Sequence, residues 1–446
     1  MMEQKIKQQT IKKQNNQQQL KGKRILVATI SADGHFNPLT GLGKYLLEAG
    51  VEIRWYTSGI YRERLENLGI PHYPLVAAGE LHPLNIDELH PQRKLITDAG
   101  EKANFDMTLL GEVSVGYLED IIQIRKTFPF DLVITDSMFP AIPLIKAKLK
   151  LPVLAIGIMP LAEQSVDTAP FGTGLYPPQN EEQAKAYAEM RDIFNNVVLK
   201  GSIESFAEIM QRNGLTPSNV YMFDTLVRHA DLYLQIGSPS FEYKRSDLGT
   251  NIRFIGSLLP YTNPVKGKKW FDEKVKDYND IVLVTQGTVE RDIDKILVPT
   301  LEAFKNSNTL IVATTGGWQT KALQERYPYE NMIIEDFIPF DDVMQYATVF
   351  VTNGGYSGAL LGIKHKIPMV AAGVHEGKSE ICARIGYFRY GINLNTETPT
   401  ADAIRDAVNT VISDASYMDN VAKLSDEMQH YDAKELCVGY ILELLN

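Results

Sequence analysis

The stretch from Val349 to Asn395 constrains the fold more than any other part of the chain. It opens on the apolar run Val349–Val351, which predicts a buried parallel strand. The small-residue loop Asn353–Gly358 follows, and a helix is expected from Ala359. A glycine-rich turn between a strand and a helix presents unpaired backbone amides at the positive end of the helix dipole. We interpret this segment as an anion site in an α/β sheet; the alternative is an ordinary βα turn.

The unit that follows repeats this pattern. The apolar run Ile367–Ala371 predicts a second strand, and it ends in the polar loop Gly373–Lys378. Because parallel strands place their carboxyl ends at one edge of the sheet, the two polar loops are expected to lie side by side. Together they predict a pocket for a phosphate-bearing nucleotide and a sugar.

The first part of the chain has the same rhythm of strands and helices. Strands are predicted at Arg24–Ile30, Val51–Thr57 and Asp131–Asp136. After the first strand, Asn37 is expected to cap a helix with Pro38 in its first position. Strands that alternate with helices predict a doubly wound parallel sheet, so the fold class is α/β.

A chain of 446 residues exceeds what one hydrophobic core usually organises, so two domains are expected. A polar stretch rich in turn formers between the two βα series is the predicted linker. The predicted division is a polar tail at 1–23, a first domain at 24–260, a linker at 261–280, a second domain at 281–430 and a C-terminal helix within 431–446 that packs back on the first domain.

Charge and cysteine content exclude several classes of protein. The total charge is −10, but residues 1–24 carry +6, so the remainder carries −16. An acidic body argues against nucleic acid as the main partner. The sequence has no apolar run long enough for a membrane span. Cys382 and Cys437 lack metal-ligand spacing and are expected to be buried free thiols of a cytoplasmic protein.

Six short motifs occur in order along the chain. They are Gly34–Pro38, Phe254–Pro260, Val284–Thr288, Phe337–Phe340, Val351–Gly355 and Glu376–Lys378. In this order and at these separations they resemble the family-one, UDP-dependent glycosyltransferases, and in particular bacterial members of the macrolide-transferase type. The resemblance runs from Arg24 to the C-terminus. It implies the GT-B fold, in which two Rossmann-like domains face each other across a cleft.

In this family the histidine of the first motif is the general base, and His35 matches it. An imidazole can take the proton of a hydroxyl at neutral pH, which agrees with that role. The partner carboxylate of the family matches Asp136, whose task is to orient the imidazole. Two alternatives stay open: His35 as a loop residue that only forms a hydrogen bond, and Asp136 as a helix N-cap.

The donor motif departs from the family pattern. Asn353 stands where most members have a phosphate-binding histidine, Phe337 and Phe340 replace a Trp–Gln pair, Leu361 replaces the ribose-binding glutamate, and Gly377-Lys378 replaces the closing Asp–Gln pair. Phe337 can still stack on uracil, and Glu376 can take over the sugar hydroxyls. The predicted donor-binding residues are Gly287, Thr288, Phe337, Ile338, Asn353, Gly354, Gly355, Ser357, Gly358, Glu376, Gly377 and Lys378.

The resulting hypothesis is an inverting O-glycosyltransferase that moves a hexose, with glucose as first choice, from a UDP-sugar to a hydroxyl of a small aromatic or macrolide-like acceptor. No metal and no cofactor are expected. The loop Pro160–Pro178 is a candidate acceptor wall, with a plain surface loop as the alternative. The rival functions are a sugar-nucleotide-binding protein without transfer activity and a sugar-nucleotide epimerase with the same fold.

Overall fold

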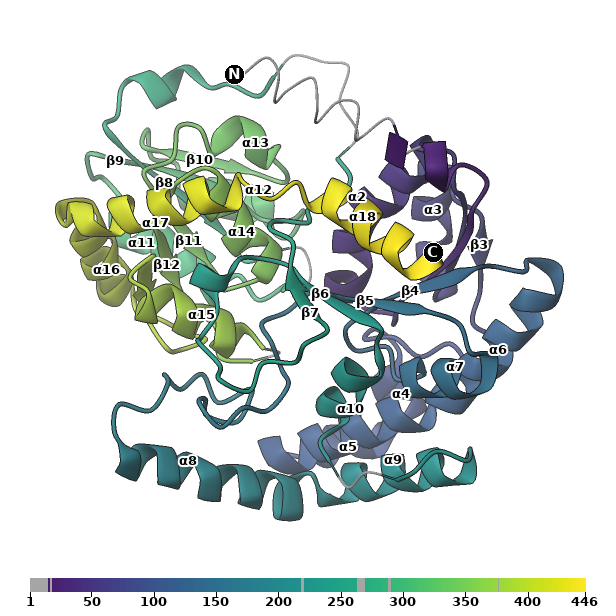
Figure 1. The fold of residues 1–446 in the computed structure, drawn as a ribbon. Coiled ribbons are helices and arrows are strands. Elements are labelled where there is room, and N and C mark those ends of the chain that lie inside the picture. Colours follow the sequence, from purple (N-terminus) through teal and green to yellow (C-terminus); the bar gives the residue numbers. More distant parts are fainter. Residues whose placement is uncertain (1–14, 17, 218–219, 263–268, 288–289, 376) are drawn as a thin grey trace, which may run out of the picture.

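A computed structural model of the chain describes residues 15–16, 18–217, 220–262, 269–287, 290–375 and 377–446. In this part of the chain, parallel strands form two sheets (Figure 1). The first, in the order β3-β2-β1-β4-β5-β6-β7, contains β1 (Arg24–Ala28), β2 (Glu52–Tyr56), β3 (His72–Tyr73), β4 (Leu132–Asp136), β5 (Val153–Gly157), β6 (Leu232–Gln235) and β7 (Ile252–Phe254). The second, in the order β10-β9-β8-β11-β12-β13, contains β8 (Asp280–Thr285), β9 (Thr309–Thr314), β10 (Met332–Glu335), β11 (Val349–Thr352), β12 (Met369–Ala371) and β13 (Gly391–Asn393). The α/β prediction is confirmed.

Helices connect the strands and cover both sheets (Figure 1). Those between the strands of the first sheet are α2 (Asp33–Glu48), α3 (Arg62–Leu68), α4 (Ile86–Leu89), α5 (Ala99–Glu112), α6 (Ser114–Thr127), α7 (Ile142–Leu149), α8 (Glu181–Ile193), α9 (Lys200–Arg212) and α10 (Met222–His229). The later ones are α11 (Leu297–Phe304), α12 (Thr320–Arg326), α13 (Phe340–Val343), α14 (Tyr356–Lys364), α15 (Lys378–Tyr387), α16 (Ala401–Ser413), α17 (Ala415–Met428) and α18 (Ala433–Leu445). In the described part of the chain, every helix is too short or too polar to span a lipid bilayer.

Each sheet has one point at which the strand order reverses. In the first sheet β1 lies between β2 and β4, and in the second β8 lies between β9 and β11. The loops that leave two adjacent strands in opposite directions open a crevice at such a point, and ligands of open α/β sheets bind there. The crevices therefore lie beyond the carboxyl ends of β1 and β4 and of β8 and β11.

The start of α2 differs from the prediction. The helix begins at Asp33, so Asn37 is not its cap and Pro38 lies inside it. Pro38 costs the helix only one backbone hydrogen bond near its start, because proline lacks an N–H. Packing of Phe36 offsets the lost hydrogen bond, because Phe36 is fully buried and its ring stacks on Tyr61 at a centroid distance of 4.1 Å. As a consequence His35 lies in the first turn of α2 rather than in a loop.

Two further elements have details that hydrophobic periodicity does not predict. Helix α5 begins at Ala99, because the Asp98 side chain caps it by accepting the Glu101 N–H at 2.9 Å. The edge strand β13 was not predicted, since Gly391–Asn393 has one β-branched residue and its pairing with β12 is a tertiary contact.

One apolar cluster passes through both halves of the molecule. It includes Ile25 and Trp55 from the first half, Leu283 and Phe350 from the second, and Cys437 from α18. Figure 1 shows α17 and α18, in yellow, running from the second half to the first, where α18 packs on α2. The predicted linker, 261–280, follows β7 and ends on Asp280, the first residue of β8; its residues 263–268 lie outside the described residues. Both cysteines are buried and free, as expected.

Candidate active site

The first part of the site lies at the crevice between β1 and β4. His35 is in the first turn of α2, which follows β1, and Asp136 is the last residue of β4. His35 Nδ1 and Asp136 Oδ1 are 2.8 Å apart. The carboxylate is fully buried, whereas 13% of the His35 side chain is exposed. The two predicted catalytic residues, which are 101 positions apart in the sequence, are therefore in direct contact.

Asp136 is held on both of its carboxylate oxygens. Oδ2 accepts the Ile30 N–H at 2.8 Å, and Oδ1 also accepts the Met138 N–H at 2.8 Å. Since an ionised carboxylate only accepts hydrogen bonds, the contact with His35 assigns the proton to Nδ1 and leaves Nε2 with its lone pair. The N-cap interpretation of Asp136 is wrong, because the next helix, α7, begins only at Ile142.

The second part of the site lies at the crevice between β8 and β11. Gly287 follows β8 and Asn353 follows β11, and the Asn353 side chain joins the two loops by donating from Nδ2 to the Gln286 carbonyl at 2.6 Å. The adjacent Gly354 has φ +77°, and a Cβ atom there would lie 2.4 Å from the Cys382 sulfur. Only glycine fits, so the loop backbone packs directly on Cys382. Burial raises the pKa of the Cys382 thiol to about 12, which keeps it protonated.

The helix that follows this loop begins earlier than predicted. Helix α14 begins at Tyr356 instead of Ala359, so Ser357 and Gly358 belong to its first turn. Its N-cap, Gly355, makes no side-chain capping hydrogen bond. Among the described residues no side chain caps the first amides of α14, which form the positive end of a helix dipole, as an anion site requires. The Tyr356 hydroxyl anchors this turn by donating to the Ile236 carbonyl of the first half at 2.8 Å.

The loop after β12 is held by a residue that the sequence did not indicate. Glu397 Oε1 accepts the N–H of Val374 at 2.7 Å and that of His375 at 3.1 Å, and Oε2 pairs with Lys295 at 3.3 Å. Lys295 also pairs with Glu290 at 2.5 Å. A small cavity beside Asn353 is lined by these three charged residues and by Lys378, the first residue of α15. The only signal for Glu397 was an acidic residue in a loop, which is too common to single out.

The nucleobase end of the predicted donor site lies after β10. Phe337 is 68% exposed, while Ile338 is buried. A Cβ atom on Gly317, in the loop after β9, would lie 3.6 Å from the Phe337 ring. Trp318 is next to that glycine, and the Arg291 guanidinium stacks over its ring at 4.2 Å. Trp318 was not predicted, because it lies outside the family motifs.

The remaining predicted residues are distributed unevenly. Thr288 and Glu376 lie outside the described residues. Gly377, with φ +75°, caps α15. Leu361 is partly buried and packs against the main apolar cluster. Within the described ranges, no group of three or more His, Cys, Asp or Glu side chains is arranged to hold a metal ion.

Comparison with known proteins agrees with this geometry. Residues 117–435 match the model of the family described as UDP-glucoronosyl and UDP-glucosyl transferase. The 4'-demethylrebeccamycin synthase of Lentzea aerocolonigenes is 30% identical over 414 residues, which cover 92% of this chain and 97% of that protein. UDP-glycosyltransferase 2 of Phaeomoniella chlamydospora is 29% identical over 447 residues, covering 94% and 95% of the two chains.

Solved structures show the same fold at low sequence identity. The glycosyltransferase of kitacinnamycin superposes with a TM-score of 0.74 at 16% identity and covers 96% of this chain and 100% of its own. CalG4, the calicheamicin glycosyltransferase, has a TM-score of 0.74 at 17% identity, with 95% and 98% covered. The fold is GT-B, as predicted from the motifs. On the family match and the 30% identity over nearly its full length, the chain belongs to the UDP-glucoronosyl and UDP-glucosyl transferase family and is a UDP-dependent glycosyltransferase.

Proposed function

We propose that the enzyme transfers a hexose from a UDP-sugar to a hydroxyl of a small aromatic or macrolide-like acceptor. The transfer inverts the configuration of the sugar, and His35 is the general base. Glucose is the hexose that we propose first. The contact between His35 Nδ1 and the buried Asp136 carboxylate carries this proposal. It leaves Nε2 as the one basic ring nitrogen and fixes the orientation of the ring.

The reaction follows from these positions. The acceptor hydroxyl gives its proton to His35 Nε2 while its oxygen attacks the anomeric carbon of the sugar. The bond between that carbon and the diphosphate oxygen breaks, and UDP leaves from the opposite face, so the configuration inverts. The imidazolium that forms is stabilised by the Asp136 carboxylate 2.8 Å from Nδ1.

The leaving diphosphate needs positive charge where its own negative charge grows. The first turn of α14 supplies amides for this charge, and Lys378, which lines the small cavity beside Asn353, supplies a cation. The Asn353 side-chain amide donates one N–H to the Gln286 carbonyl, and its second N–H can donate to a phosphate oxygen. Because these groups can neutralise the diphosphate, we expect EDTA to leave the transfer rate unchanged. A rate that requires added Mg²⁺ or Mn²⁺ would contradict this diphosphate site.

Relatives support the substrate classes. The UDP-glucosyltransferase 1 of Beauveria bassiana, whose name specifies glucose, is 28% identical over 94% of this chain. The names of the rebeccamycin and kitacinnamycin enzymes refer to natural products. Within this chain, Phe171 and Tyr176 place aromatic rings in the loop Pro160–Pro178, which agrees with an aromatic acceptor.

The test is a transfer assay. The protein is incubated with UDP-glucose, with and without phloretin or erythromycin, and products are followed by mass spectrometry. We expect a glucosylated acceptor and UDP only when an acceptor is present. UDP-sugar conversion without an acceptor would indicate an epimerase, and binding without conversion would indicate a binding protein.

Two variants locate the base within that assay. His35→Ala is expected to lower kcat by roughly 10²–10⁴-fold and to leave UDP affinity near that of the parent, because the two halves of the site come from different sheets. His430→Ala is the matched control, since His430 is exposed and its Nδ1 forms a hydrogen bond with the nearby Glu427 carbonyl at 3.2 Å. Full activity of His35→Ala would remove His35 from the mechanism.

A further inference from the structure

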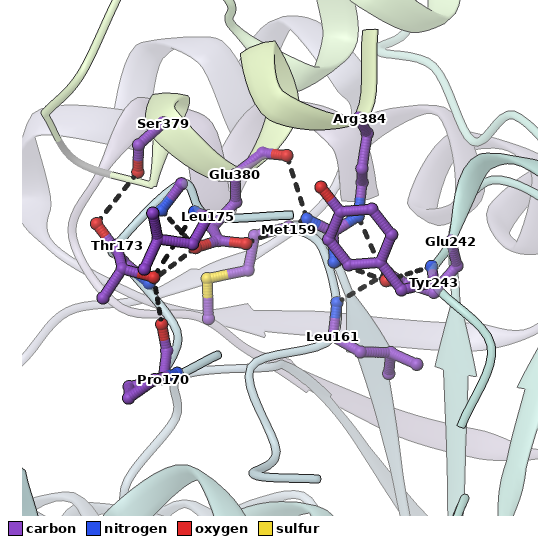
Figure 2. A network of polar contacts seen from close by, with 12 residues as sticks. Met159, Leu161, Pro170, Thr173, Leu175, Glu242, Tyr243, Ser379, Glu380 and Arg384 are labelled. Atoms are coloured by element: carbon purple, nitrogen blue, oxygen red, sulfur yellow. Dashed lines mark hydrogen bonds and ion pairs between the residues drawn. The ribbon is translucent and has the colours of Figure 1, made fainter. Parts of the chain in front are cut away.

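A loop of the first half lies directly on a helix of the second half. The backbone N–H groups of Gly172 and Gly174 both donate to Oε1 of Glu380, at 2.8 and 3.0 Å, and the Ser379 hydroxyl donates to the Gly172 carbonyl at 3.1 Å (Figure 2). The loop folds on itself through the Thr173 hydroxyl, which donates to the Pro170 carbonyl at 2.8 Å. Segments more than 200 residues apart in the sequence are thus joined at the first turn of α15.

Glu380 also belongs to a buried network of ion pairs. Its Oε2 pairs with Arg384 Nη1 at 3.0 Å, and the Arg384 guanidinium also pairs with Glu242, which lies beyond β6 in the first half (Figure 2). The side chains of all three residues are at most 7% exposed. Glu242 Oε2 also accepts the Leu161 N–H at 3.1 Å. Separating the halves here would strand buried charges, so the ion pairs keep the loop and the helix together.

The same loop touches the donor motif. A Cβ atom on Gly377 would lie 3.8 Å from the Phe171 ring, so Phe171 borders the loop that carries the predicted sugar contacts. At its other end, Tyr176 meets Tyr387 edge to face at a centroid distance of 5.4 Å. The loop therefore follows α15 from its first residues to its last, with Glu380 as the only side chain that binds two of its backbone amides in the described structure.

We propose that Glu380, fixed by Arg384 and Glu242, is a positioning residue that sets the loop Pro170–Tyr176 as the acceptor wall beside the donor motif. This rests on the proposed function, in which that loop contacts the acceptor. An acceptor then binds a surface whose position is determined by an ion pair between the two halves. Loss of the contact weakens acceptor binding in the ground state and the transition state alike, so KM for the acceptor rises while kcat changes little.

Two glycines of the loop provide a matched pair of variants. Both have positive φ, +94° at Gly172 and +65° at Gly174, so alanine strains the backbone at either position. A Cβ atom at Gly174 would lie 3.0 Å from the Ser379 Cβ, whereas one at Gly172 would have nothing within 4 Å. Gly174→Ala therefore pushes the loop away from α15 through a steric clash. Gly172→Ala strains the backbone more but adds no such clash, so it is the control for the clash.

We expect Gly174→Ala to raise the acceptor KM by roughly 10-fold more than Gly172→Ala, with kcat within a few-fold of the parent. Hydrogen exchange of the peptide 170–176 is expected to speed up in Gly174→Ala for the same reason. Equal effects of the two substitutions on KM and exchange would overturn the proposal. Faster exchange with an unchanged KM would overturn it too, because the loop would then have no part in acceptor binding.

Glu380→Gln tests the charge itself. It keeps the size of the side chain and weakens the pair with Arg384, so it is expected to raise the phloretin KM and speed up exchange in 170–176. The control is Asp231→Asn, which breaks a pair with Lys146 at the opposite end of β6 and leaves the loop contacts in place. Should the parent bind phloretin without transferring glucose, the proposed function fails, while the phloretin dissociation constants of these variants, from calorimetry, still decide the role of Glu380.

Discussion

At the scale of single residues, the site depends on the hydrogen bonds that each side chain can form. Asp136 accepts hydrogen bonds from His35 and from two backbone N–H groups, and it is fully buried. A carboxylate is the one common side chain that can accept all three, because it has two oxygens and no proton to donate. The geometry therefore fixes both the orientation of His35 and the nitrogen that carries its proton.

We predict that Asp136→Asn lowers kcat by roughly 10²–10⁴-fold, and by less than His35→Ala. The asparagine amide must point its NH₂ group at a backbone N–H or at His35 Nδ1. In the second case Nδ1 becomes the acceptor and Nε2 carries the proton, which removes the base. Steady-state kinetics with a parallel thermal melt separates this effect from unfolding. If the folded variant turns over like the parent, Asp136 has no part in the reaction.

Leu361 gives a prediction on nucleotide choice. The family pattern has a glutamate there that bonds the ribose hydroxyls, and a site built for a hydroxyl rejects an analogue that lacks it. Leucine has no such group, so the parent is expected to distinguish UDP from dTDP by on the order of 1 kcal/mol or less. Leu361→Glu is expected to favour UDP by roughly 1–3 kcal/mol, as measured by calorimetric competition at one salt concentration. Leu361→Gln controls for size, and a parent with a hundredfold preference for UDP would show that another residue binds the ribose.

At the scale of elements, loops at the carboxyl ends of β8, β11 and β12 build the donor side. Each is fixed by a polar contact from a neighbouring loop: Asn353 to the Gln286 carbonyl, and Glu397 to the amides of Val374 and His375. The strands give these loops a common edge, and the side chains then remove the freedom that loops otherwise have.

Glu397→Gln should therefore weaken donor binding. The amide can keep one oxygen on the Val374 and His375 N–H groups, but its NH₂ group faces Lys295 and the ion pair is lost. We expect KM for UDP-glucose to rise by about 3- to 10-fold, equivalent to about 1 kcal/mol, with the acceptor KM unchanged. Glu302→Gln, which weakens a surface pair with Lys305, serves as the control. Identical donor KM values in both variants would show that the loop after β12 does not depend on Glu397.

At the scale of the whole molecule, the two halves share one apolar cluster, and α18 belongs to it. Its buried side chains include Cys437, Val438, Ile441 and Leu442, and the Tyr45 hydroxyl of α2 donates to Glu435. The chain thus ends by crossing from the second half to the first and covering α2, the helix that carries His35.

Deleting residues 431–446 is expected to lower the melting temperature of the whole chain and to reduce transfer. The deletion exposes the face of α2 and the cluster beneath it, and each aliphatic side chain lost from burial is worth roughly 1.5–3 kcal/mol. Differential scanning calorimetry measures this. An unchanged melting temperature would mean that α18 contributes nothing to the stability of the two halves.

The sequence by itself determined the alternation of strands and helices, because the runs that form β1, β8 and β11 are apolar and local, and hydrophobic periodicity is a local signal. It also determined Gly287 and Gly354 as turn positions, because glycine adopts a positive φ more easily than other residues. Both residues have a positive φ in the structure. His35 and Asp136 were found because the family motifs mark the two strand ends at which they lie. These predictions need no knowledge of which segments meet in space.

Tertiary structure decided the rest. Phe36, in the first turn of α2, stacks on Tyr61, and the tautomer of His35 depends on a carboxylate 101 positions away. Glu380 and Arg384 have the i,i+4 spacing of any surface pair on a helix, and neither their burial nor their link to Glu242 can be read from that spacing. Glu397 likewise looks like any surface charge in the sequence. These charges are desolvated only when the two halves of the molecule pack together, and each buried charge then needs its partner. The position of the loop on α15 depends on these pairs.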